Sequence, residues 1–128
     1  MRTILVCGGR EYADRDAVFA ALDSVHAQAP IDLILHGACC VRGRKTNLRG
    51  ADRWGQEWAQ EREVPYLGVP ARWTLLGKAA GYERNGRMLV FRPVGVVAFP
   101  GGPGTANMVR QAKAAGIDVW IPYGEVAR

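Results

Sequence analysis

Short runs of β-branched and apolar residues alternate along this chain with longer segments whose apolar positions recur at helical spacing. The short runs cover residues 3–7, 32–36, 64–69, 94–99 and 118–121. Each is bounded by polar or turn-forming residues and has the length of a buried strand. The pattern therefore predicts five β-strands.

Four amphipathic helices are expected between these strands. The segment 14–28 carries Val18, Leu22 and Val25 at helical spacing, and 50–62 carries an i, i+4 pair of tryptophans, Trp54 and Trp58. A third helix is expected over 77–91 and a fourth over 105–115, which ends at a glycine. Strands that alternate with helices in this way predict a parallel sheet that is covered on both faces.

The expected architecture is a single α/β domain over residues 1–128, a Rossmann-like, doubly wound sheet with the strand order 3-2-1-4-5. No linker, repeat or second domain interrupts the pattern. In such sheets a ligand binds beyond the carboxyl ends of the strands, where the winding reverses. The loops that follow the strands are therefore the places to look for chemistry.

Composition supports an ordinary globular protein, with 48% hydrophobic and 23% charged residues. Neither a membrane-spanning run nor a signal-like N-terminus is present, so we expect a cytoplasmic protein. The three cysteines have no metal-ligand spacing, and we expect reduced thiols, no metal site and no separate cofactor.

Positive charge exceeds negative charge, with a formal net charge of +5. Most basic residues are scattered, but the segment 42–49 carries four positive charges and no acid. This run and the pI of about 9.5 allow nucleic-acid binding, although no recognised motif accompanies them. The basic segment 39–49 either reaches over the cleft toward phosphate or is a mobile surface loop.

A glycine-rich loop after the fourth strand is the strongest chemical signal. It reads Phe99-Pro100-Gly101-Gly102-Pro103-Gly104-Thr105 and leads directly into a helix. Backbone N–H groups at the positive end of a helix dipole form an anion site, and we expect Thr105 to cap the helix and donate to phosphate. The alternative is a tight turn that binds nothing. The loop matches neither a Walker A motif nor a dinucleotide fingerprint.

A second glycine loop, Cys7-Gly8-Gly9-Arg10, ends the first strand. In the expected strand order the two loops are neighbours, which places the Arg10 guanidinium near the phosphate site. The alternative is a surface arginine after a structural turn.

Three further places supply weaker candidates. Asp52 is either a favourable charge at a helix N-terminus or a carboxylate for ribose hydroxyls. His36, before Gly37, is either a general base or a hydrogen-bonded structural residue. The glycines of the third helix indicate a close approach to its backbone, so Arg84 and Asn85 are candidate ligand contacts.

Together these motifs resemble the SLOG superfamily of Rossmann-like proteins, which includes the Lonely guy nucleotide hydrolases and the DNA-processing Smf/DprA proteins. The match is best to the small YspA-type, cpYpsA-related group and extends over nearly the whole chain. The residues that carry it are Cys7-Gly8-Gly9-Arg10, His36-Gly37-Ala38, Gly50-Ala51-Asp52, Glu57-Trp58-Ala59, Trp73, Gly77-Lys78-Ala79-Ala80-Gly81, Arg84-Asn85, Met88 and the loop 99–105.

The resemblance implies a nucleotide or nucleotide-derived ligand, phosphoribosyl or ADP-ribose-like, over the Pro-Gly-Gly-x-Gly-Thr loop. Its implied contacts are Gly8, Gly9, Arg10, Gly37, Asp52, Arg84, Asn85, Gly101, Gly102, Gly104 and Thr105. Lonely guy hydrolases use an arginine that maps onto Arg84 and a glutamate that maps onto Met108. Methionine cannot move a proton, so hydrolysis of that kind is disfavoured.

Three functions remain open at this point. The first is a nucleotide-binding sensor or carrier. The second is an N-glycosidic hydrolase or transferase that uses Asp52, Arg84 or His36, and the third is nucleic-acid binding. A homodimer is also expected, because SLOG relatives commonly dimerise and because Trp54 and Trp58 would form a good buried face.

Overall fold

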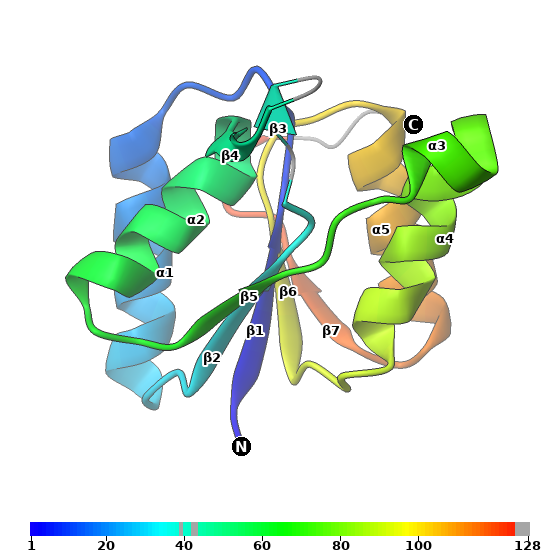
Figure 1. Ribbon diagram of the computed structural model, residues 1–128. Helices are drawn as coiled ribbons and strands as arrows, with labels where there is room; N and C mark the ends of the chain where they lie inside the picture. Colours follow the sequence, from blue (N-terminus) through cyan, green and yellow to red (C-terminus); the bar gives the residue numbers. More distant parts are fainter. Residues whose placement is uncertain (39, 42–43, 125–128) are drawn as a thin grey trace.

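The computed structural model describes residues 1–38, 40–41 and 44–124, built around a five-stranded parallel sheet (Figure 1). The order along the sheet is β5-β2-β1-β6-β7, and all neighbouring strands are parallel. Numbered among these five strands alone, the order is 3-2-1-4-5, which confirms the predicted doubly wound α/β fold. The strands are β1 (Thr3–Cys7), β2 (Leu33–His36), β5 (Tyr66–Gly68), β6 (Gly95–Ala98) and β7 (Asp118–Trp120).

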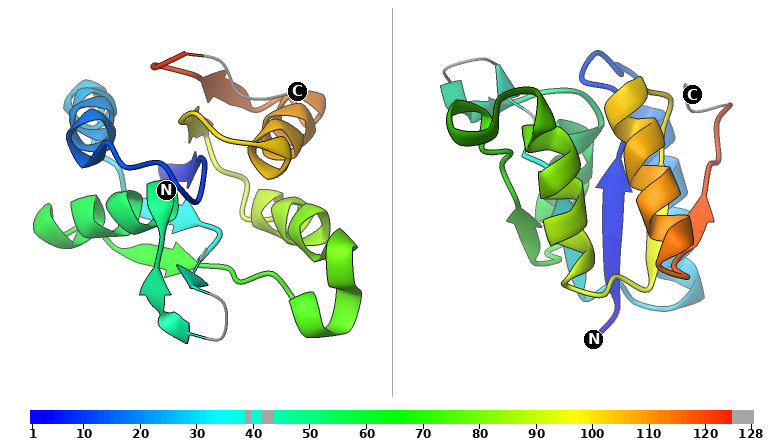
Figure 2. Two further views of the ribbon diagram at one scale, coloured as in Figure 1. Left: turned by 90° about the horizontal axis from the view of Figure 1, so that it is seen from above. Right: turned by 90° about the vertical axis from the view of Figure 1, so that its right-hand side faces the viewer.

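Two pairs of helices cover the two faces of the sheet (Figures 1 and 2). On one face α1 (Arg15–Gln28) and α2 (Gly50–Glu61) pack on Ile4, Val6 and Ile34. On the other face α4 (Ala80–Leu89) and α5 (Pro103–Ala114) pack on Leu5, Leu35 and Val96. Because successive strand residues point to opposite faces, a fully apolar strand supplies both cores.

The prediction of one helix over 77–91 is wrong about where that helix begins. The chain forms a short helix α3 (Trp73–Leu76), a 3₁₀ turn η1 (Gly77–Ala79) and then α4. Gly77 has φ +59°, which breaks the helix and favours glycine. A Cβ at Gly81 would meet the Trp73 ring at 3.4 Å, and one at Gly86 would meet Gln111 at 3.3 Å. Gly77 therefore serves a turn, and the space beside Gly81 and Gly86 is bordered by side chains of the protein.

Part of the basic segment pairs with itself. Its strands β3 (Cys40–Val41) and β4 (Arg44–Leu48) form a separate antiparallel sheet directly before α2. Figure 2 shows this hairpin standing apart from the main sheet. The thiol expected at Cys39 and the residues 42–43 lie outside the described residues, whereas Cys7 is a free and buried cysteine.

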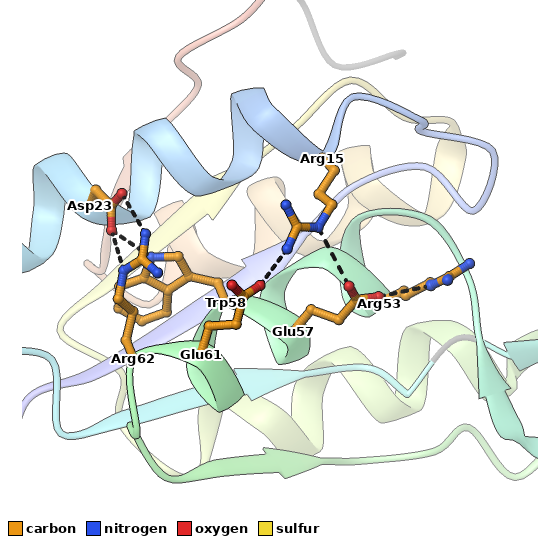
Figure 3. A network of polar contacts seen from close by, with 7 residues as sticks. All are labelled: Arg15, Asp23, Arg53, Glu57, Trp58, Glu61 and Arg62. Atoms are coloured by element: carbon orange, nitrogen blue, oxygen red, sulfur yellow. Dashed lines mark hydrogen bonds and ion pairs between the residues drawn. The ribbon is translucent and has the colours of Figure 1, made fainter.

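The two tryptophans of α2 pack within their own chain. Trp58 is completely buried, and its indole N–H donates to Asp23 of α1 at 2.8 Å (Figure 3). Trp54 packs on the same core and donates to the Tyr12 carbonyl at 2.8 Å. The interpretation of this pair as a face for a second copy is therefore wrong, and the homodimer stays a prediction.

Asp23→Ala is expected to lower the free energy of unfolding by about 1–3 kcal/mol at pH 7, because the buried Trp58 donor loses its acceptor. Hydrogen bonds from Arg62 hold the pKa of Asp23 below its usual value of 3.8, despite the opposing effect of burial. The contribution of Asp23 to the free energy of unfolding is thus fully present above pH 3.8 and is lost as the pH falls through the lowered pKa. Urea unfolding across pH 7 to 2.5 checks this, with the exposed Asp16→Ala as control. A difference that does not shrink in acid would contradict the assignment.

Candidate functional site

The two glycine loops meet at the carboxyl edge of the sheet. Because β1 and β6 are neighbours, their loops leave the sheet side by side, and the Gly9 amide donates to the Pro100 carbonyl at 2.9 Å. A Cβ at Gly9 would lie 3.0 Å from that carbonyl, and one at Gly8 would lie 2.6 Å from the Ala51 side chain. Gly9 thus permits the close packing of the two loops, and Gly8 permits the close packing of the first loop on α2.

Helix α5 begins at Pro103, two residues earlier than expected, and its N-cap is Gly102 without a side-chain cap. The expectation that Thr105 caps the helix is therefore wrong, since Thr105 is the third helical residue. The amides of Gly101, Gly102, Gly104 and Thr105 donate to no other residue in the described part of the chain. These N–H groups form an unsatisfied set of donors at the positive end of α5.

The outer side of this loop is open. Among the residues that the structure describes, a Cβ at Gly102 or at Gly104 would meet no atom within 4 Å, whereas one at Gly101 would collide with Thr105 and with the Gly9 amide nitrogen. Packing therefore explains Gly101, but neither packing nor a positive φ explains Gly102 and Gly104. Their bare backbone faces a space that a ligand can enter.

That space is part of a cleft of about 560 Å³, which we call the loop cleft. It is a typical size for a small-molecule site. The structure brings every ligand-binding candidate of the sequence to its wall. These residues are Gly8, Gly9, Arg10, Gly37, Asp52, Arg84, Asn85, Gly101, Gly102, Gly104 and Thr105.

Six further residues line the loop cleft that the sequence did not single out as ligand contacts, namely Cys7, Glu11, Tyr12, Met88, Pro100 and Pro103. Burial, followed by the nearby Asp52 carboxylate, raises the pKa of the Cys7 thiol. The thiol therefore stays protonated at neutral pH and is a poor nucleophile.

Asp52 reaches the cleft because of Gly50. Gly50 has φ +61°, and a Cβ there would collide with the Gly9 carbonyl. The start of α2 therefore packs against the first glycine loop, with the Ala51 amide donating to Gly9 at 3.2 Å. This contact places a buried carboxylate, 7% exposed, in the wall of a cleft rich in backbone donors.

Arg84 and Asn85 tie several loops of the cleft together. The Arg84 guanidinium donates to the Gly37 carbonyl after β2, and its Nε donates to the Asn85 Oδ1 at 3.1 Å. The Asn85 amide nitrogen donates to the carbonyl of Gly104 and to Asn107 Oδ1, both at 3.1 Å. These bonds favour positioning of the glycine loop as the main role of Asn85.

His36 is 1% exposed and does not line the loop cleft. Its Nδ1 accepts from the Ala38 amide at 2.9 Å, so the proton of the neutral ring is on Nε2, which donates to Gln56 Oε1 at 2.7 Å. Both ring nitrogens are therefore engaged, which supports the structural interpretation over a general base.

The floor of the cleft beside the glycine loop is apolar. Met108, in the second turn of α5, is 1% exposed, and Met88 of α4 is 2% exposed. No carboxylate occupies the position that the hydrolases of the superfamily use. Across the described residues, no group of three or more His, Cys, Asp or Glu side chains is arranged to hold a metal ion.

None of the described helices has both the length and the hydropathy of a membrane span.

Comparisons with known proteins identify a matching family and a relative of similar length. Residues 2–75 match the family described as the YspA, cpYpsA-related SLOG family. The chain is also 34% identical, over 133 residues, to the Gene 61 protein of Mycobacterium phage D29, and the alignment covers 98% of each chain.

Proposed function

Because this chain belongs to the YspA, cpYpsA-related SLOG family, and because its glycine loop presents open donors, we propose that it binds a nucleotide or nucleotide-derived ligand. The phosphate accepts hydrogen bonds from the amides of Gly101, Gly102, Gly104 and Thr105. The observation that carries the proposal is the unsatisfied donor set at the start of α5, where a Cβ at Gly102 or Gly104 would meet no described atom within 4 Å.

The remaining walls fit the rest of such a ligand. Asp52 supplies a carboxylate that accepts from ribose hydroxyls, and Arg10 supplies positive charge at the rim. Met88 and Met108 supply apolar contact but no acid or base. These residues favour a sensor or carrier that holds its ligand without cleaving it.

Titration calorimetry with matched pairs tests the proposal, each pair being a nucleoside 5′-monophosphate and its nucleoside. At least one monophosphate should bind, and its nucleoside should bind at least about 10-fold more weakly, since it lacks hydrogen bonds to a charged group. Inorganic phosphate should compete. Equal affinity within every pair would contradict a phosphate site. Native mass spectrometry of the purified protein would identify a ligand that co-purifies.

A further inference from the structure

A second cleft, of about 630 Å³, lies between the loop after β1 and helix α2, and we call it the α2 cleft. It shares the residues Arg10, Glu11 and Tyr12 with the loop cleft. The two clefts are therefore adjacent, with the 10–12 segment as their common wall.

The acidic side chains of the α2 cleft already have partners. Glu11 is ion-paired with Arg49, and Glu57 is paired with Arg53 at 2.9 Å and with Arg15 at 3.5 Å (Figure 3). In contrast, the exposed Arg10 guanidinium forms no ion pair or hydrogen bond with the rest of the described chain. The cleft thus offers an uncommitted cation, while its carboxylates are neutralised.

Gln56 adds hydrogen-bond donors to the α2 cleft, and the buried His36 fixes the orientation of its side-chain amide. Because His36 Nε2 is the donor in their 2.7 Å hydrogen bond, the Gln56 side chain must accept through Oε1. The two N–H groups of its amide then remain for the α2 cleft, which Gln56 lines. The buried histidine is therefore a positioning residue that orients a donor toward the cleft.

We propose that the α2 cleft binds the second phosphate, and the group attached to it, of a nucleoside diphosphate derivative. This inference rests on the proposed function, since the first phosphate lies on the glycine loop. Arg10 lines both clefts and therefore contacts the diphosphate where the ligand passes from one to the other. The Gln56 amide donates to the distal phosphate. A nucleoside monophosphate ends within the loop cleft and leaves the α2 cleft empty.

The test compares AMP with ADP-ribose by titration calorimetry in the wild type and in Gln56→Glu. The glutamate keeps an acceptor for His36 but replaces the amide donors by a charged oxygen. We expect Gln56→Glu to weaken ADP-ribose binding by about 10-fold or more, the effect of losing a hydrogen bond to a charged group, and to leave AMP binding within about 2-fold. Gln28→Glu, an equal change of charge at the exposed end of α1, should alter neither.

Arg10→Ala gives a second variant, for which the loss should be larger with ADP-ribose than with AMP. If the wild type binds both ligands equally and Gln56→Glu changes neither affinity, the α2 cleft is not a subsite and the inference is overturned. If neither ADP-ribose nor any nucleoside monophosphate of the panel binds the wild type, the proposed function itself fails and this inference fails with it.

Discussion

Gly102→Val is expected to abolish nucleotide binding and to leave the protein folded. A Cβ at Gly102 would meet no described residue within 4 Å, so the valine fits the structure but occupies the space over the loop amides. Loss of two or more hydrogen bonds to a phosphate, each about 1.5–3 kcal/mol, predicts an affinity at least about 100-fold weaker. Calorimetry and ligand-induced shifts of Tm measure this loss.

Two variants control this experiment. Ala114→Val adds a β-branched residue at the other, exposed end of α5 and should bind normally. Gly101→Val should instead lower stability, because its side chain would collide with Thr105 and the Gly9 amide nitrogen. A folded Gly102→Val that binds with wild-type affinity would place the phosphate elsewhere.

The second expected result is that the protein releases no free base from nucleoside monophosphates. Met108 lines the loop cleft where the related hydrolases carry a glutamate, and general acid–base help of that kind accelerates a reaction by roughly 10²–10⁴-fold. Binding should therefore occur without turnover. Chromatography of a panel of monophosphates after long incubation measures this, with a Lonely guy hydrolase as the positive control.

Met108→Glu places a carboxyl group at that position and should yield at most a trace of hydrolysis, since Arg84 here is bonded to the Gly37 carbonyl. Free base that appears with the wild type and disappears with Asp52→Asn would overturn this expectation. Asp52 would then be a catalytic residue, and the protein would be a hydrolase.

The parts of the site that could be predicted were those with a local signal. Glycines before a helix indicate backbone donors regardless of the fold around them, and the loop 99–105 was identified in this way. The role of each glycine could not be predicted. A side chain at Gly8 or Gly101 would collide with residues that are distant in the sequence or across a turn. A side chain at Gly102 or Gly104 would collide with no described residue, and this difference is visible only in the folded structure.

The interpretation of the tryptophans failed for a related reason. An i, i+4 aromatic pair marks one apolar face of a helix but not what covers it. Here α1 covers that face, and Asp23 accepts a hydrogen bond from the Trp58 indole N–H, although the two residues are 35 positions apart in the chain. The prediction of a helix over 77–91 was wrong at its start because the spacing of apolar residues does not reveal the φ of +59° at Gly77.

The five strands of the main sheet, the four main helices and the glycine loops could be predicted from the chain alone, since alternation of apolar runs and helical spacing is a local property. The strand order predicted from the sequence is the one observed, and that order makes the loops after β1 and β6 neighbours. Three features follow from the packing of the fold: His36 lies beneath Gln56, Asp52 enters the loop cleft, and a second cleft adjoins that cleft. Those relations join side chains from different elements, and their distances depend on how helices pack on the sheet, which no local pattern records.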